Sequence, residues 1–255
     1  MPVNSVRLFR TASHPCSYKP NHRAATVFVD PNLIIDQPLN SKLSDLGYRR
    51  SGKHLYRPDC DLCKACISCR LPVDKFQTKR RHRKILKKNM DLKVIEENSL
   101  TSNASYDLYE RYINSRHRDG DMYPASMEQF ESFIKMKTLD TRFFLFYLQK
   151  ELVAVSVTDM LQQGLSAVYT YFDPDLTDRS LGNYVILWQI EKTRSTGLPY
   201  LYLGYWIKNC PKMQYKSTFR PLELLVDKQW ILAHKFMLCS IVLPIVLKSG
   251  TMRPL

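Results

Sequence analysis

Four cysteines occupy every third position of CDLCKACISCR, residues 60–70. Two thiolates separated by two residues can reach one metal ion from a tight turn, so overlapping pairs of this kind favour a metal site. Zinc and iron–sulfur clusters both accept four thiolates, and the spacing does not choose between them. The competing interpretation is a set of reduced, buried cysteines. A catalytic thiol is less favoured, because the flanking His54 and His82 form no triad-like pattern.

A second candidate stretch is DPDLTDRSLGNYVILWQIE, residues 173–191. Arg179 and Gly182 stand where a predicted strand gives way to a predicted helix. A glycine at this place lets an anionic group approach the helix N-terminus, whose free N–H groups bind phosphate. An ordinary first helical turn would explain the same residues.

A third stretch, GYWIKNCPKMQYKSTFRPLE at 204–223, alternates aromatic and basic side chains. Such a mixture suits the end of a single-stranded nucleic acid, because bases stack on aromatic rings while phosphates pair with cations. A surface loop that places its aromatic residues in the core is the alternative. The residues concerned are Tyr205, Trp206, Lys208, Lys212, Tyr215, Lys216 and Arg220.

The charge of the chain points to a polyanionic partner. The sequence has 38 Lys and Arg against 24 Asp and Glu, which gives a net charge of +14. Seven of the ten residues from Lys79 to Lys88 are basic, and no acidic residue interleaves with them. Like charges this dense repel one another, and a phosphate backbone would supply the missing countercharge. A solvated helix face is the competing interpretation.

Apolar patterns predict the elements that position these stretches. In the first hundred residues we expect a strand in ATVFVDP (25–31), a helix within 36–52 that ends at a glycine, and strands in RLPVDKF (70–76) and DLKVIEE (91–97). The basic run at 78–89 separates the last two.

The rest of the chain combines helices with longer apolar runs. We expect a helix capped by Ser105, a second helix over 126–137, and an antiparallel meander of three strands in 141–174. A helix over 181–196 that stops at a glycine then leads to a buried strand over 200–206. Strand, helix and strand at this spacing form a crossover unit, so the sequence predicts an α/β (α+β) fold with a mixed sheet.

Hydropathy argues against a membrane partner. The segment MPVNSVRLFRTASHPC has no apolar leader, and FMLCSIVLPIVL at 236–247 is too short for a bilayer and contains Pro244. We interpret 236–247 as a buried C-terminal element and expect a cytoplasmic protein. Thiols stay reduced in the cytosol, and the seven cysteines would leave one unpaired, so a metal is favoured over disulfides.

Five segments together resemble a known family: HPCSY (14–18), LGYRRSG (46–52), YRPDCDLCKAC (56–66), YTYFDPDLTDRSLGNYVILWQIE (169–191) and GLPYLYLGYWIKNCPKMQYKSTFRPLE (197–223). They are similar to segments of the bacterial aminoacyl-tRNA–protein transferases, the aspartate/glutamate leucyltransferases, which are related to the eukaryotic arginyltransferases. The resemblance runs from about residue 7 to residue 230. The segments are long, which makes it specific.

The resemblance implies an enzyme that moves leucine from Leu-tRNA to the N-terminal Asp or Glu of an acceptor protein and so marks it for the N-degron pathway. It also implies an acyltransferase fold of the GNAT type that uses no coenzyme A. Three alternatives stay open from the residues alone: an arginyl donor, a non-catalytic RNA-binding metalloprotein, and a coenzyme A-dependent acetyltransferase. We expect a cysteine-containing N-terminal domain over 1–95 and a transferase domain over 96–255.

The resemblance adds Cys16 to the metal ligands. We expect Cys16, Cys60, Cys63 and Cys66 to hold zinc or an iron–sulfur cluster in a structural role, with Cys69 as the spare cysteine, which could replace one of the four. Four ligands spaced three apart would be cramped in one short segment.

The expected chemistry needs a base, a carboxylate receptor and a tRNA site. The acceptor α-amine has a pKa near 8 and must lose a proton, for which Asp173 and Asp175 are candidates, with Tyr205 as a further catalytic candidate. Arginine suits a planar carboxylate, so we expect one of Arg49, Arg50 and Arg70 to bind the acceptor side chain. The other predicted substrate-binding residues are His117, Arg179, Gly182, Lys212, Lys216 and Arg220. The predicted tRNA-binding residues are Arg80, Arg81, Arg83, Lys84, Lys87 and Lys88.

Overall fold

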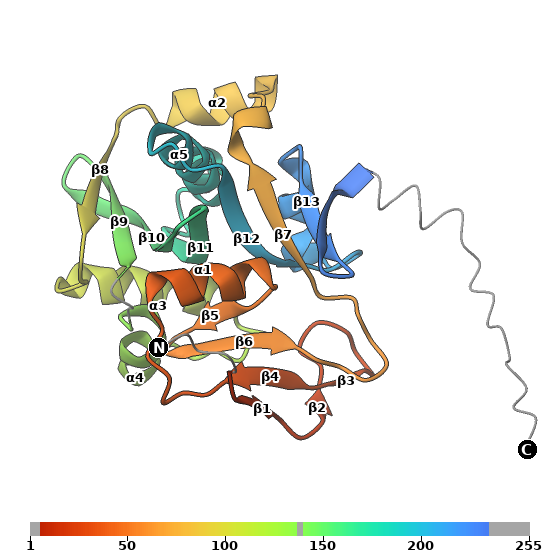
Figure 1. The fold of residues 1–255 in the computed structure, drawn as a ribbon. Coiled ribbons are helices and arrows are strands. Elements are labelled where there is room, and N and C mark those ends of the chain that lie inside the picture. The colour runs from red at the N-terminus through yellow and green to blue at the C-terminus, as the bar shows by residue number, and fades with distance from the viewer. Residues whose placement is uncertain (1–5, 137–139, 235–255) are drawn as a thin grey trace, which may run out of the picture.

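The computed structural model describes residues 6–136 and 140–234, and Figure 1 shows the arrangement of its elements. The strands are β1 Leu8–Arg10, β2 His14–Pro15, β3 Arg23–Ala24, β4 Thr26–Val29, β5 Arg49–Ser51, β6 His54–Pro58, β7 Ile67–Pro72, β8 Leu92–Glu97, β9 Thr141–Leu148, β10 Glu151–Leu161, β11 Gly164–Phe172, β12 Tyr200–Trp206, β13 Glu223–Val226 and β14 Gln229–Leu232. The α-helices are α1 Gln37–Asp45, α2 Arg80–Lys88, α3 Asn103–Arg116, α4 Met127–Gln129 and α5 Leu181–Ser195. Short 3-10 segments are η1 Val73–Lys75, η3 Thr177–Arg179 and η4 Pro211–Thr218, and η2 Phe130–Ile134 is π-helical.

The larger sheet has eight strands in the order β14-β13-β7-β12-β11-β10-β9-β8. β11 and β12 pair in parallel, and α5 connects them, as the predicted crossover unit requires. The other neighbouring strands are antiparallel, including the predicted meander β9-β10-β11. The predicted α/β class and mixed sheet are therefore confirmed.

The helices α3 and α5 cover opposite faces of this sheet. Successive side chains of a strand point to opposite faces, so one strand can pack against both helices. On β9, Phe143 and Leu145 pack in the cluster that includes α3, whereas Phe144 and Phe146 pack in the cluster that includes α5. All four are buried. Each buried side chain of this size stabilises the fold by about 1.5–3 kcal/mol relative to exposure, so α3 and α5 are firmly fixed on the sheet.

The smaller sheet has the order β1-β4-β6-β5 and packs against α1. Asp36 caps α1, because its carboxylate accepts a hydrogen bond from the backbone N–H of Leu39 at 2.9 Å. The helix is followed by Gly47 at φ +87°, where a Cβ would meet the Leu225 side chain at 2.9 Å. This glycine turn leads into β5 and confirms the predicted helix stop.

The larger sheet also contains strands from the first hundred residues. β7 pairs with β12 and β13 in the middle of the larger sheet, and β8 forms its edge beside β9. The predicted domain boundary at residue 95 stays a prediction. By strand pairing, β1–β6 belong to the smaller sheets and β7–β14 to the larger sheet, so the change of sheet comes before residue 67. Local patterns indicate that a segment is a strand without indicating which strand it will join.

Three predicted boundaries differ from the structure. The N-cap of α3 is Ser102, whose hydroxyl accepts from the Ala104 N–H, while Ser105 is fully buried inside the helix. The helix expected over 126–137 is shorter, although Ser126 does accept a hydrogen bond from the Gln129 N–H at 3.2 Å. The strand expected over 70–76 instead starts at Ile67 and ends at Pro72.

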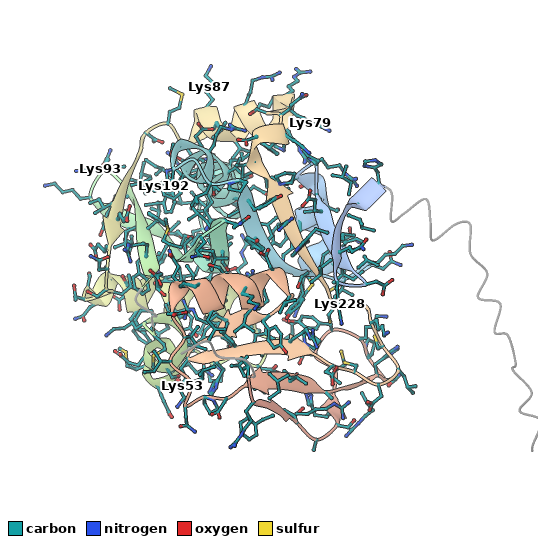
Figure 2. All side chains as sticks on the ribbon, in the orientation of Figure 1. Lys53, Lys79, Lys87, Lys93, Lys192 and Lys228 are labelled. Carbon is teal, nitrogen blue, oxygen red and sulfur yellow. The ribbon has the colours of Figure 1, made fainter. Side chains whose placement is uncertain are left out.

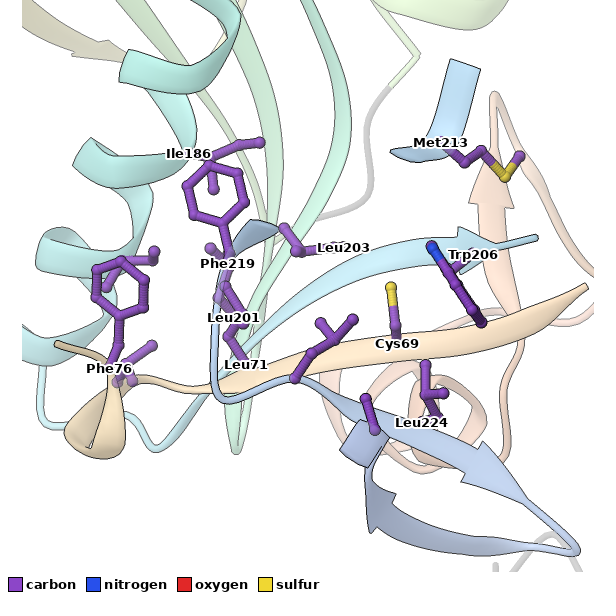
Figure 3. Close-up of a cluster of buried hydrophobic side chains, with 14 of the residues drawn as sticks. Cys69, Leu71, Phe76, Ile186, Leu201, Leu203, Trp206, Met213, Phe219 and Leu224 are labelled. Carbon is purple, nitrogen blue, oxygen red and sulfur yellow. The ribbon is translucent and has the colours of Figure 1, made fainter. Parts of the chain in front are cut away.

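The core beneath β7 and β12 is apolar and close to the site described below. Figure 3 shows Cys69, Leu71, Leu201 and Leu203 in this cluster beside Trp206. No helix within 6–136 and 140–234 has the length and apolar character that a membrane span needs. The predicted buried element at 236–247 lies outside the described residues.

Candidate active site

A cavity of about 580 Å³ lies between α5, β11, β12 and η4, and the smaller sheet contributes part of its wall through β5 and β6. Gly182 on α5 lines it, and a Cβ at this position would meet the Phe172 ring at 2.9 Å. The glycine thus lets the first turn of α5 lie close to β11. Part of the wall is apolar and includes Ala167, Ile186 and Leu203.

The charged groups around the cavity are all basic. No Asp or Glu is found among the described residues that line it. The basic side chains are Arg49, Arg116, His117, Lys212 and Lys216. The cavity is therefore suited to bind an anionic ligand. It is unsuited to bind a cationic ligand, which would be buried beside these basic side chains.

Arg49 directs its guanidinium toward this cavity. The side chain is buried, and its Nη2 donates to the carbonyl of Ala167 at 2.9 Å. That is the single hydrogen bond found for it within the described residues. Gly204, at φ +85°, lies against the guanidinium, and a Cβ there would be 3.4 Å from Nη2. Arg49 therefore keeps donors for an anion in the cavity.

Arg50, the next residue on β5, lies on the opposite face of the strand and has no donor left. Its Nε and Nη2 bind both carboxylate oxygens of Asp159 at 2.7 and 2.8 Å. Its Nη1 donates to the carbonyls of Gly52 and Met136, and Nη2 also contacts Thr141. The predicted role in acceptor binding is wrong for Arg50, because all its N–H groups are used inside the fold.

Arg70 is also engaged outside the cavity. It pairs with Glu223 at 2.8 Å and with Asp45 at 3.1 Å, and its guanidinium lies 3.6 Å from the Tyr200 ring centroid. Its position on β7 fixes β13 and α1 to the larger sheet. The prediction that Arg70 binds the acceptor is therefore not supported. Of the three predicted arginines, Arg49 is the one that is still a candidate for acceptor binding.

Lys216 has its amine beside Arg49. Its Nζ donates to the carbonyl of Tyr205 at 2.6 Å, and the residue is only 8% exposed. The pKa of Lys216 is lowered to about 8, chiefly by burial; the positive charge of Arg49 also lowers it, while the thiols of Cys69 and Cys210 act in the opposite sense. This lysine is the most strongly perturbed base in the cavity.

His117 and Lys212 stand together at another part of the cavity wall. Lys212 pairs with Asp119 at 2.8 Å and is half-exposed. Burial lowers the pKa of His117, and the neighbouring Lys212 and Arg116 lower it further, whereas Asp119 raises it. The imidazole is thus mostly neutral at pH 7, and its ring makes a T-shaped contact with the ring of Tyr112.

The two predicted carboxylate bases lie outside the cavity. Asp173 pairs with Arg111 at 3.2 Å and accepts a hydrogen bond from the backbone N–H of Asp175 at 3.0 Å. Neither residue lines the cavity. The structure therefore does not support the prediction that Asp173 or Asp175 removes the acceptor proton.

Tyr205 does line the cavity, but its hydroxyl is occupied. The hydroxyl donates to the carbonyl of Gly47 at 2.8 Å and also lies 3.2 Å from the carbonyl of Tyr56. Burial raises the pKa of Tyr205. The side chain therefore joins β12 to the smaller sheet and does not supply a reactive oxygen.

Arg179 and Arg220 do not line the cavity either. Arg179 forms a two-pronged ion pair with Asp91, at 2.8 and 2.9 Å, and donates to the carbonyl of Lys88. Arg220 is half-buried just beyond η4. Of the predicted Arg179–Gly182 pair, only the glycine contributes to the cavity wall, because Arg179 turns toward α2.

The basic run forms α2, and the six cations predicted to bind tRNA are all exposed. His82 is the buried residue of this helix, and its ring stacks against those of Phe76 and Phe219. Figure 2 shows Lys79 and Lys87 at the end of the molecule formed by α2, with Lys53 at the opposite end. The helix thus presents its charges to one surface, as a polyanion-binding element would.

The four predicted metal ligands are partly buried near one another. The pKa of Cys66 is raised to about 12, first by burial and then by the thiols of Cys16, Cys60 and Cys63. Within the part of the chain that the structure describes, however, no group of three or more His, Cys, Asp or Glu side chains is arranged to hold a metal ion. The metal site therefore stays a prediction.

Cys69 is separate from these cysteines. It lies in the core on β7, is 1% exposed, and its thiol is 3.2 Å from the carbonyl of Gly204. The alternation of β7 directs Cys69 into the apolar cluster of Figure 3.

Sequence reasoning missed several residues of the cavity. Arg116 was overlooked although it precedes His117, and Gly204 carries no signal beyond being a glycine within an apolar strand. Gln189 was also missed. It is a polar residue within the apolar stretch YVILWQI of α5, it is fully buried, and its Nε2 donates to the hydroxyls of Ser156 and Thr158.

A cation-lined cavity beside a mixed sheet, together with an exposed basic helix, defines an α/β protein built for an anionic substrate. Comparison with known proteins agrees with this class. Residues 14–84 match the family described as "Arginine-tRNA-protein transferase, N terminus", and residues 104–226 match its C-terminal counterpart. The two matches cover the cysteine run, residues 80–84 of α2 and all the residues that line the cavity.

The curated relatives are more similar still. An aspartate/glutamate leucyltransferase of Alcanivorax borkumensis is 53% identical over 228 residues, which cover 89% of this chain and 94% of the relative. Those of Pseudomonas aeruginosa and Teredinibacter turnerae are 51% and 50% identical, over 89% of this chain and 96% and 93% of the relatives. The chain belongs to the bacterial aminoacyl-tRNA–protein transferase family. It is an aminoacyltransferase, so the alternative of a non-catalytic RNA-binding protein is wrong.

Solved structures resemble the chain only distantly. The FemX crystal structure has a TM-score of 0.44 at 10% identity and covers 81% of each chain. L-PGS from Bacillus licheniformis has a TM-score of 0.43 at 11% identity, covering 65% of this chain and 51% of its own. At these values we base no argument on the likeness.

Proposed function

We propose that this enzyme transfers leucine from Leu-tRNA to the N-terminal Asp or Glu of acceptor proteins. The observation that carries this proposal is the charge of the cavity, which has five basic side chains and, among the described residues that line it, no carboxylate. Such a cavity can bind the phosphates of a tRNA end and the carboxylate of an acidic acceptor. The names of the relatives, all aspartate/glutamate leucyltransferases, support the same reaction.

The same charge argues against arginine as the transferred residue. An arginyl ester would bring a guanidinium into a cavity that already holds Arg49 and Lys216 and has no carboxylate in its described wall. A buried cation without a partner is costly, whereas a leucyl side chain can pack against apolar residues such as Ile186 and Leu203. We therefore assign a neutral, apolar donor to this site.

We propose that Arg49 binds the acceptor carboxylate. It is the arginine of the three candidates that faces the cavity with unused donors, and a guanidinium can bind both oxygens of a carboxylate at once. The ester of the donor is already activated, so the enzyme needs no covalent intermediate. Its main task is to hold ester and amine together, which can contribute several kcal/mol, on the order of 7–11, to lowering the barrier.

We also propose that α2 binds the body of the tRNA, that the GNAT type of acyltransferase fold applies, and that the product enters the N-degron pathway in the cytosol. The exposed cations of α2 and the mixed sheet with its parallel β11–β12 pair support the first two of these. The N-degron and cytosolic assignments rest on the family resemblance.

For the cysteines, we propose a structural metal held by Cys16, Cys60, Cys63 and Cys66. Four partly buried thiols that affect one another's charge suit zinc or an iron–sulfur cluster as a donor set. When bound, the metal would join the N-terminal segment to the loop before β7. The transfer chemistry needs nothing from it.

The decisive experiment compares donors and acceptors in one assay. Leu-tRNA and Arg-tRNA, each carrying a labelled amino acid, are offered with peptides that begin with Asp, Glu, Asn or Lys. We expect transfer from Leu-tRNA to the Asp and Glu peptides, and at least tenfold less from Arg-tRNA or to the Asn and Lys peptides. Equal use of both tRNAs would refute the assignment of an apolar donor.

A further inference from the structure

Lys216 is a buried lysine that the fold itself does not require. It lies in η4, lines the cavity, and is 8% exposed. Lysine is almost never fully buried unless it is paired. Among the ion pairs of the described residues none includes Lys216, and the amine donates instead to the carbonyl of Tyr205 at 2.6 Å. Such a group destabilises the fold, so a functional role is the natural explanation.

The groups around the Lys216 amine are neutral or basic. Arg49 on β5, Cys69 on β7 and Cys210 before η4 are close enough to affect its charge. Tyr205 on β12 contributes the carbonyl, and the ring centroid of Tyr215 is 5.8 Å from Nζ. Among the described residues of these elements, no carboxylate holds the amine in its charged form.

Lys216 and Arg49 line the same cavity, and the charge of Arg49 affects the Lys216 amine. An N-terminal aspartate carries its α-amine and its carboxylate on adjacent carbon atoms. If Arg49 binds the carboxylate, as proposed above, the α-amine of the same residue enters the cavity that Lys216 also lines, and we expect it to reach the Lys216 amine. The nitrogen that attacks the ester is thus placed beside a second amine of the protein.

We propose, on the basis of the function proposed above, that Lys216 carries a proton from the attacking amine to the leaving oxygen of the tRNA. The neutral acceptor amine attacks the ester carbonyl carbon, and a C–N bond forms. The neutral Lys216 amine accepts one proton from that nitrogen. The C–O bond to the ribose then breaks with its electron pair on oxygen, and Lys216 returns the proton to this oxygen. The products are an amide and a tRNA with a free hydroxyl, and Lys216 is unchanged.

The protonation state of Lys216 suits this role. At pH 7 a lysine with its ordinary pKa of about 10.4 is neutral in only about one molecule in 2,500, whereas a pKa near 8 makes about one in ten neutral and able to accept a proton. Burial brings the pKa of Lys216 to about 8, close to that of an N-terminal amine. Proton transfer between groups of similar pKa is efficient in both directions, as a proton carrier requires.

The test uses single-turnover transfer of labelled leucine from Leu-tRNA to an Asp peptide by the full chain. We expect K216M and K216R to lose activity about equally, by about 10²–10⁴-fold, because methionine has no proton site and arginine stays protonated. Leu-tRNA binding should change less than threefold. K150M, which removes an exposed surface lysine, is the matched control and should keep the wild-type rate.

The pH dependence gives a readout that a structural role would not change. Below pH 8 the wild-type kcat/KM for the acceptor needs two neutral amines, so its logarithm should rise with a slope of two per pH unit. In K216M and K216R only the acceptor amine titrates, and the slope should fall to one. In K216A, trimethylamine should restore part of the rate, since it can carry a proton but cannot form an amide.

The outcomes separate this inference from the proposed function. A wild-type enzyme that transfers leucine to no acidic peptide would refute the proposed function itself. A wild-type enzyme that transfers leucine, with K216R keeping a third or more of the rate or with a wild-type slope of one, would refute the role of Lys216 alone. K216M is expected to fold, because it replaces an unpaired buried charge with an apolar side chain of similar length, so its rate and pH slope test the inference independently of K216R.

Discussion

The assignment of Arg49 to the acceptor carboxylate makes a sharp prediction. The perturbation is R49Q, which removes the positive charge and most of the donors while keeping a polar side chain of similar length. The neighbouring Arg50 carries the internal ion pair, so the stability of the fold should change little when Arg49 is replaced. Arg49 itself gives up one hydrogen bond, to the carbonyl of Ala167 at 2.9 Å.

The expected magnitude follows from the contact that would be lost. A hydrogen bond to a charged group contributes about 1.5–3 kcal/mol, and each 1.4 kcal/mol is a factor of about ten in rate. We therefore expect kcat/KM for an Asp peptide to fall by about 10- to 150-fold in R49Q. For a peptide that begins with Asn, which has no carboxylate to lose its partner, the change should stay within about threefold.

The assay is a two-by-two comparison of enzyme and peptide. Initial rates of leucine transfer are measured at low peptide concentration for wild type and R49Q, each with matched Asp and Asn peptides. The ratio of the two losses isolates the interaction between Arg49 and the carboxylate. If R49Q reduces transfer to the Asn and Asp peptides by the same factor, Arg49 does not bind the acceptor carboxylate.

Three further predictions concern other parts of the molecule. R50Q, which leaves Asp159 buried without its partner, should lower the unfolding free energy by about 3–5 kcal/mol, seen as a drop of roughly 6–20 °C in a thermal melt; an unchanged melting temperature would contradict the pairing. C66S should remove bound metal measured by elemental analysis and C69S should retain it, so metal loss from C69S alone would exclude the proposed ligand set. A triple alanine variant of α2 replaces the exposed cations Arg83, Lys84 and Lys87. It should weaken tRNA binding and reduce the slope of log affinity against log salt concentration by about 2–3. A change no larger than that of the control K53A would count against tRNA binding by α2.

Much of the larger sheet could be predicted from local patterns. The apolar runs of β9, β10 and β11, the glycine after α5 and the apolar strand β12 each have a local signature that the structure confirms. The position of β7 between β12 and β13 could not be predicted, because a strand pattern does not specify its partner.

The site was harder to predict than the sheet for a related reason. A basic or acidic side chain looks the same in sequence whether it is paired internally or faces a cavity. Arg49 and Arg50 differ only in the face of β5 that they occupy, and the partner that distinguishes them, Asp159, is far away along the chain. Asp173 was predicted from its place at the end of a strand, but its pairing with Arg111 depends on how α3 packs.

Because Arg49 and Arg50 point to opposite faces of β5, binding of the acceptor depends on whether the smaller sheet is folded against β10. Arg50 joins the smaller sheet to β10 through its ion pair with Asp159, and its neighbour Arg49, the proposed binder of the acceptor carboxylate, lines the cavity. In a molecule whose smaller sheet had come loose, α2 would still display its cations, but Arg49 would no longer face the cavity. Such a molecule would hold tRNA without modifying any protein. An incompletely folded enzyme would therefore transfer no amino acid to an acceptor protein.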